Sequence, residues 1–109
     1  MNIDLLYTSE QEELLRAINW MHTDDGSQID RHQIREMIVN DDCYISVLEQ
    51  LKTLKQLGYI TILELDQDNE IYILSGNYDM LCAKINQIYS NKRKEFAKET
   101  AKLVSSLIP

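Results

Sequence analysis

The clearest hydrophobic pattern of the chain lies in its middle third and predicts a helix followed directly by a β-hairpin. Apolar residues recur at spacings of four and three, at Val47, Leu51 and Leu54, which places them on one face of a helix over 43–57. Gly58 follows, and a residue without Cβ favours the left-handed backbone that ends many helices. Two β-rich runs come next, at 59–65 and 70–74, and a polar turn at 66–69 joins them.

A helix with a broad apolar stripe is predicted near the N-terminus. Ser9 and Glu12 have the S-x-x-E form of a capping box, so we expect this helix to begin at about Glu10. Trp20 lies on the flank of its apolar stripe and is expected in the core. Residues 3–7 form a short apolar arm, for which packing over the domain and packing on a partner subunit are both open.

A second, shorter helix is predicted from a second capping box. Ile29 sits alone between polar residues, as expected of a short β contact before a helix. Asp30 then caps a helix that begins at Arg31, with Gln33 in the third position of the box. Asp42 is expected to cap the helix over 43–57, where its carboxylate would accept amide hydrogen bonds.

The C-terminal segment predicts a long amphipathic helix. From Asn77 onward no glycine or proline occurs before the terminus, so about 30 residues can form a helix roughly 45 Å long. A polar and basic run at 90–94 leaves open a continuous helix or a break between two helices. Beyond it, Phe96, Leu103 and Leu107 continue an apolar stripe, for which we expect self-association, with a fold-back onto the core as the alternative.

The charge of the chain is negative and unevenly distributed. The 109 residues carry 18 Asp and Glu against 11 Lys and Arg, a net charge of −7. Residues 1–79 hold 16 acids and 5 bases, whereas residues 80–109 hold 2 acids and 6 bases. This acidic protein therefore lacks the overall positive field that draws many proteins to nucleic acid.

Few residues suggest a catalytic or metal-binding site. Cys43 and Cys82 are far apart and lack the spacing of a zinc site, and His22 and His32 make no constellation with them. No nucleophile motif or phosphate-binding glycine loop is present, so we expect neither enzymatic activity nor a cofactor or metal. No apolar run approaches the roughly 20 residues that span a bilayer, and the N-terminus lacks a secretion signal, so a cytoplasmic protein without membrane contact is expected.

The helix and hairpin together resemble the winged helix-turn-helix superfamily, and more loosely the bacterial MarR-type and PadR-type regulators with a C-terminal dimerisation helix. The resemblance covers most of the chain. Its most specific part is the pattern V-x-x-x-L-x-x-L-x-x-x-G-[YL]-I, formed by Val47, Leu51, Leu54, Gly58, Tyr59 and Ile60. It implies an α+β fold, mostly α, with a two-stranded wing and a long C-terminal helix. Residues 1–76 would be the winged-helix body and 77–109 a helical dimerisation segment of the same domain.

The resemblance implies a dimeric DNA-binding protein, most simply a transcriptional regulator. In such proteins the third helix enters the major groove, and neighbouring basic residues contact phosphates. Dimerisation through the C-terminal helix would use Phe96, Leu103 and Leu107. The residues expected to contact double-stranded DNA are Arg31, His32, Arg35, Tyr44, Ser46, Glu49, Gln50, Lys52, Lys55, Lys92, Arg93 and Lys94.

The hairpin departs from this pattern. Glu64, Asp66, Asp68 and Glu70 surround its tip, where DNA-binding wings usually present lysine or arginine. Carboxylates facing phosphates would lose the counterion-release contribution to affinity. The alternative is therefore an acidic winged-helix module that binds another protein, such as a plasmid or phage replication or partition adaptor, or a phage inhibitor of a host nucleic-acid-binding protein.

Overall fold

The computed structural model describes residues 3–66 and 68–107 and shows an α+β fold that is mostly helical. The chain forms three long helices, one short helix, one 3₁₀ turn and a small sheet. In chain order the elements are α1 (Ile3–Thr23), β1 (Gln28–Asp30), α2 (Arg31–Met37), the 3₁₀ turn η1 (Asp41–Cys43), α3 (Tyr44–Gln56), β2 (Ile60–Asp66), β3 (Asn69–Leu74) and α4 (Tyr78–Leu107).

The sheet has three antiparallel strands in the order β1-β3-β2. The hairpin β2–β3 is the predicted one, and β1 adds the expected short contact, with Ile29 opposite Tyr72. Tyr72 also lies opposite Ile62 and is fully buried, so these residues mark the inner face of the sheet. A bulge interrupts the hairpin between Glu64 and Asp66.

The core lies between the inner face of the sheet and the helices α1, α2, α3 and α4. The apolar stripe predicted for α3 is confirmed, because its buried residues meet the inner strand residues and the stripes of α1 and α4. The fully buried residues include Leu14, Ile18, Ile29, Ile34, Val47, Leu51, Leu54, Tyr72, Leu81, Ile85 and Tyr89.

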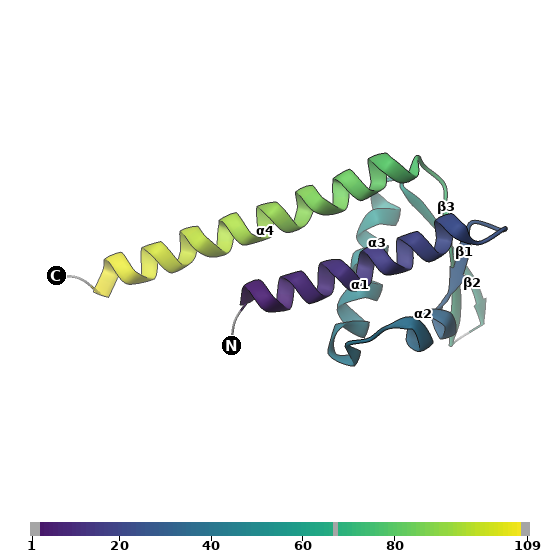
Figure 1. Cartoon of the computed structure of the whole chain (residues 1–109), viewed down its shortest axis with the longest axis horizontal. Helices are drawn as coiled ribbons and strands as arrows, with labels where there is room; N and C mark the ends of the chain where they lie inside the picture. The colour runs from purple at the N-terminus through teal and green to yellow at the C-terminus, as the bar shows by residue number, and fades with distance from the viewer. Residues whose placement is uncertain (1–2, 67, 108–109) are drawn as a thin grey trace.

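Helix α4 is continuous and runs antiparallel to α1 (Figure 1). The break considered at 90–94 is absent, since all thirty residues from Tyr78 to Leu107 are helical. The Asn77 side chain accepts a hydrogen bond from the Met80 amide at 3.0 Å, which confirms the predicted cap. The distal end of α4 projects beyond α1 instead of folding back, so the molecule is 59 Å long and only 26 and 22 Å across.

Two predictions for α1 were wrong. The helix begins at Ile3 rather than Glu10, so Ser9 lies inside it and residues 3–7 are helical rather than a separate arm. The local capping signal is overridden because Tyr7 packs edge-on against Tyr89 of α4, which stabilises the preceding helical turns. Trp20 is 40% exposed and not a core residue, since Leu14, Ile18 and other members of the stripe face the core instead.

The boundaries of α2 and α3 combine a confirmed cap with a wrong one. Asp30 and Gln33 form the predicted reciprocal capping box, with bonds of 2.8 and 2.9 Å. Asp42 does not cap α3: it lies inside η1, and its amide donates to the Asn40 side chain at 3.1 Å. Gly58 has a φ of 87°, so the predicted left-handed stop after α3 is confirmed.

Candidate functional site

The turn between α2 and α3 is held by a buried carboxylate from α1. Glu13 is only 3% exposed, and its Oε2 accepts hydrogen bonds from the amides of Val39 and Asn40 at 2.7 and 2.9 Å. Its other oxygen forms an ion pair with Arg16. Both bonds are charge-assisted, so Glu13 fixes where α2 ends and where η1 and α3 begin.

The outward surface beside this turn carries two arginines around one tyrosine. The Arg35 guanidinium lies over the Tyr44 ring, 4.3 Å from its centroid. Hydrogen bonding to the Tyr44 side chain raises the pKa of Arg31 above its ordinary value. These residues come from the start and end of α2 and from the first position of α3, and we call them the arginine–tyrosine cluster.

The other residues predicted on this surface differ in exposure. His32 and Glu49 are exposed, whereas Ser46 and Gln50 are half-buried. Ile45 is 60% exposed at the second position of α3 and was not predicted as a site residue. A signal was present, because Ile45 stands two residues from Val47 and so lies on the opposite side of the helix from the buried stripe.

The C-terminal half of α3 faces the hairpin across a shallow groove. Lys52 and Lys55 from α3 line this groove together with Glu64 and Glu70 from the strands. Glu70 also accepts a hydrogen bond from the Tyr72 hydroxyl at 2.6 Å. The carboxylates reduce the positive field of the two lysines, and the Glu70 carboxylate also acts on Arg31 of the arginine–tyrosine cluster.

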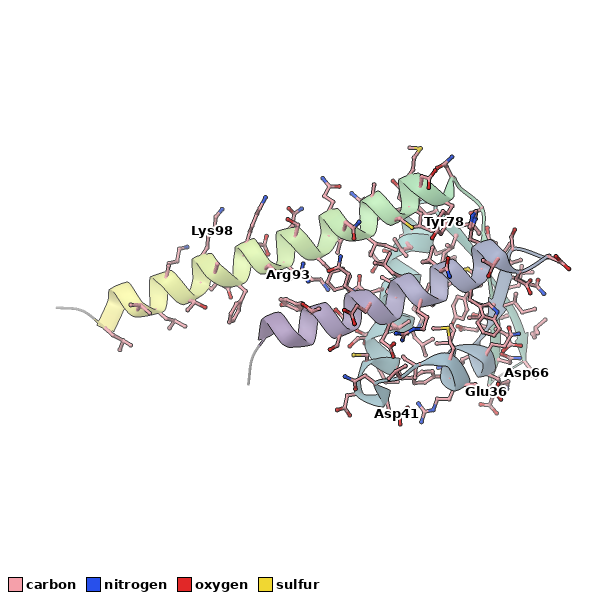
Figure 2. All side chains as sticks on the ribbon, in the orientation of Figure 1. Glu36, Asp41, Asp66, Tyr78, Arg93 and Lys98 are labelled. Atoms are coloured by element: carbon pink, nitrogen blue, oxygen red, sulfur yellow. The ribbon has the colours of Figure 1, made fainter. Side chains whose placement is uncertain are left out.

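The basic residues of α4 fall into two groups. Lys92 lies 3.7 Å from Glu10 and over the rings of Tyr7 and Tyr89, and Arg93 donates to Gln11 of α1 at 2.8 Å. Both residues, which were predicted to contact DNA, therefore contact α1 in this structure. Lys94 is exposed, and Figure 2 shows Lys98 pointing away from the side of α4 on which Arg93 lies.

The distal part of α4 continues the face that packs on α1. Leu81, Ile85 and Tyr89 are fully buried, and the same helical spacing leads on to the residues predicted for dimerisation. Val104 and Leu107 are 52% and 81% exposed. Phe96 is half-buried and Leu103 is 66% exposed. Ile108, which follows Leu107, lies outside the described residues.

Cys43 is buried in the core, and His22 packs against an aromatic ring. Burial raises the pKa of the Cys43 thiol, and the nearby Glu10 and Asp42 carboxylates raise it further, which favours the protonated form of the thiol. His22 stacks on Tyr78 with ring centroids 3.8 Å apart. Within 3–66 and 68–107, no three His, Cys, Asp or Glu residues converge as a metal site would require. In the same residues, no helix has the length and apolar character needed to cross a membrane.

Comparison of the chain with protein-family models, with curated proteins and with solved structures finds no match. The residues and geometry described above are therefore the basis for assigning a function.

Proposed function

We propose that the chain is a winged-helix protein that binds double-stranded DNA as a homodimer and acts as a transcriptional regulator. The observation that carries the proposal is the arginine–tyrosine cluster, which lies at the exposed start of α3, on the two helices that flank the turn held by Glu13. In this interpretation α2 and α3 form the helix-turn-helix, β2 and β3 form the wing, and α4 is the dimerisation helix.

The distribution of positive charge supports this surface. Residues 1–79 have five basic side chains, and four of them lie on α2 or α3: Arg31, Arg35, Lys52 and Lys55. The two lysines share their groove with two carboxylates, Glu64 and Glu70, whereas the two arginines lie around the Tyr44 ring and only Glu70 among the described carboxylates acts on Arg31, so we expect the arginines to be the stronger phosphate ligands. The DNA should therefore contact the α2 side and the N-terminal half of α3, away from the hairpin.

The exposed residues at the start of α3 suit base contacts. Ile45 offers an apolar surface for a thymine methyl group, and Glu49 can accept a hydrogen bond from a cytosine amino group. Gln50 can pair with adenine, and Ser46 with a base or a phosphate. The Tyr44 hydroxyl, already oriented by Arg31, can donate to a backbone oxygen.

The dimer contact follows from the shape of α4. Its apolar face is buried against α1 as far as Tyr89, and Val104 and Leu107 present exposed apolar side chains farther along the projecting helix. A second copy of the same helix is the simplest surface that could bury them. Lys94 and Lys98 are exposed basic residues on the outer side of α4. They would keep that side of the helix in water and limit the dimer contact to the apolar side.

The DNA-binding half of the proposal is tested by charge changes on α2. Mixed genomic fragments at about 50 mM salt should be retarded by the wild-type protein, because phosphate contacts are strong at that ionic strength. Arg31→Gln with Arg35→Gln should lower the slope of log affinity against log salt by about 2, roughly one unit per lost phosphate contact. Lys98→Gln with Lys102→Gln removes the same charge from exposed positions of α4 and is the matched control.

The two double variants distinguish DNA binding at the arginine–tyrosine cluster from a general attraction of DNA to basic side chains elsewhere on the protein. Equal losses in the two double variants would mean that the arginines have no special role. If the wild-type protein fails to retard fragments at about 50 mM salt, the regulator is excluded. Far-ultraviolet circular dichroism should show unchanged helix content in both variants, because none of the four residues is buried.

The dimer half of the proposal is tested by light scattering. Val104→Ser with Leu107→Ser should give the mass of one chain where the wild type gives two, because both side chains are exposed and their loss leaves the core intact. Leu57→Ser, at a residue 50% exposed at the end of α3, is the control and should remain dimeric. A dimer mass in the double variant would remove α4 from the proposed interface.

A further inference from the structure

The outer face of the hairpin is largely apolar, with Thr61 as its polar residue, although sheets with one solvated face usually carry polar residues there. Side chains alternate along a strand, so the buried Tyr72 places Ile71 and Ile73 on the opposite, outer face. Leu63 lies directly across from Ile71 and is 48% exposed. Leu65, in the adjacent bulge, is 59% exposed. We call these four residues the outer sheet patch.

Every charged side chain on the described strands around the outer sheet patch is acidic. Among the described strand residues 28–30, 60–66 and 69–74 none is Lys or Arg. Asp30 lies opposite Ile71 in the sheet, and Asp66 and Asp68 are exposed at the hairpin tip. Figure 2 shows Asp66 at the end of the molecule remote from the basic distal part of α4. The patch is therefore an apolar surface with an acidic margin.

We propose that the outer sheet patch is a docking site for another protein, which presents a segment of apolar side chains flanked by lysines or arginines. The apolar centre gains free energy from burial, and the acidic margin selects a basic partner. This site is separate from the arginine–tyrosine cluster and does not depend on DNA binding by it.

The same charges argue against the other occupants. DNA would meet carboxylates at the tip and no basic side chain on the strands, so it would lose the counterion-release contribution. A second copy of the patch would bring two acidic margins together, because a twofold contact pairs the same surface on both chains. A protein segment with apolar and basic side chains can pack on the apolar centre of the patch and pair with the carboxylates at its margin.

The proposal is tested with two designed peptides. Each has about 15 residues, enough for a marginally stable helix, with leucines at spacings of three and four. One peptide carries lysines at its other positions and the second carries glutamates. Titration of the lysine peptide into the full-length protein labelled with ¹⁵N should shift amide resonances of β2 and β3, with a dissociation constant below about 1 mM, and the glutamate peptide should not.

Variants on the patch distinguish specific docking from general attraction to an acidic protein. Leu63→Ser with Leu65→Ser should weaken binding of the lysine peptide at least about tenfold, because both leucines are exposed and their loss does not open the core. Asp66→Asn with Asp68→Asn should weaken binding and flatten its salt dependence. Leu57→Ser, an exposed leucine outside the patch, is the matched control and should bind as the wild type does.

Three results would overturn the proposal. One is an absence of amide shifts at about 1 mM lysine peptide. Another is shifts that lie on α1 or α4, or that persist unchanged in the double leucine variant. A third is a loss of self-association in the double leucine variant without any effect on peptide binding, because the patch would then contact a second copy of the chain. None of these results bears on the DNA test, which uses Arg31 and Arg35.

Discussion

Replacement of Glu13 by alanine should destabilise the protein more than any exposed charge change, because it removes the acceptor for two backbone amides. The carboxylate is 3% exposed and accepts from Val39 and Asn40 at 2.7 and 2.9 Å. A buried donor left without a partner costs about 1–3 kcal/mol. Since the turn lies near the surface and water can reach part of it, we expect a total loss of about 3 kcal/mol for Glu13→Ala.

The loss can be measured by urea unfolding followed by circular dichroism. With a slope of about 1.5 kcal/mol per M, the unfolding midpoint should fall by about 2 M. Glu13→Gln keeps one acceptor oxygen but loses the charge and the ion pair with Arg16, so it should cost about 1 kcal/mol. All variants must be compared at one protein concentration, because self-association would shift their apparent stability.

The neighbouring Glu12 supplies the control. Its side chain is exposed, so Glu12→Ala should change the free energy of unfolding by less than about 0.5 kcal/mol. If Glu13→Ala costs no more than Glu12→Ala, then the two amide bonds contribute nothing net, and Glu13 does not fix the turn. DNA binding by Glu13→Ala should also weaken if the position of α3 depends on this carboxylate.

Three further predictions follow from burial and backbone geometry. Burial raises the pKa of Tyr72 and Tyr89, and nearby Glu70 and Glu10 respectively raise it further. Above the ordinary tyrosine pKa of about 10 the unfolded chain therefore releases these protons before the folded chain does, so stability should fall as pH rises. Phenolate absorbance from both residues should appear only as circular dichroism is lost, and their ionisation near pH 10 in the folded protein would contradict this. Gly58→Ala should cost about 1–2 kcal/mol in urea unfolding, because φ is 87° there, although no atom lies within 4 Å of the added Cβ. Gly76→Ala, where the added Cβ makes only ordinary contacts at 3.6–3.7 Å, is the control, and equal costs would refute strain at Gly58. Trp20→Ala should cost about 1 kcal/mol or less, against the roughly 3–5 kcal/mol of a buried tryptophan, and acrylamide should quench Trp20 fluorescence in the folded wild type.

The accuracy of the sequence-based predictions depended on how local each signal was. The capping box of Asp30 and Gln33 and the stop at Gly58 were confirmed because each depends on a few neighbouring residues. The equally local box at Ser9 was wrong, because contacts between Tyr7 and Tyr89 extend α1 past it. A local signal is reliable only where no distant element offers a better contact.

In the candidate site, too, the local features could be predicted from the sequence and the contacts between elements could not. Arg31, Arg35 and Tyr44 could be named from helix periodicity, since each lies off the buried stripe of its helix. Their convergence around one ring could not be predicted, because it depends on how α2 meets α3. Lys92 and Arg93 are equally basic in the sequence, yet both contact α1 and are taken away from the surface proposed for DNA.

The sequence by itself determined the order of the helices and strands, where α3 ends, and that the hairpin is acidic. These properties follow from periodicity, turn residues and composition, all of which act over a few neighbouring residues. Only the tertiary structure decided that Glu13 holds the turn before α3, that the outer sheet patch is exposed, and that α4 projects as one unbroken helix. Each of these depends on residues far apart in the chain, whose contacts arise only when the elements pack.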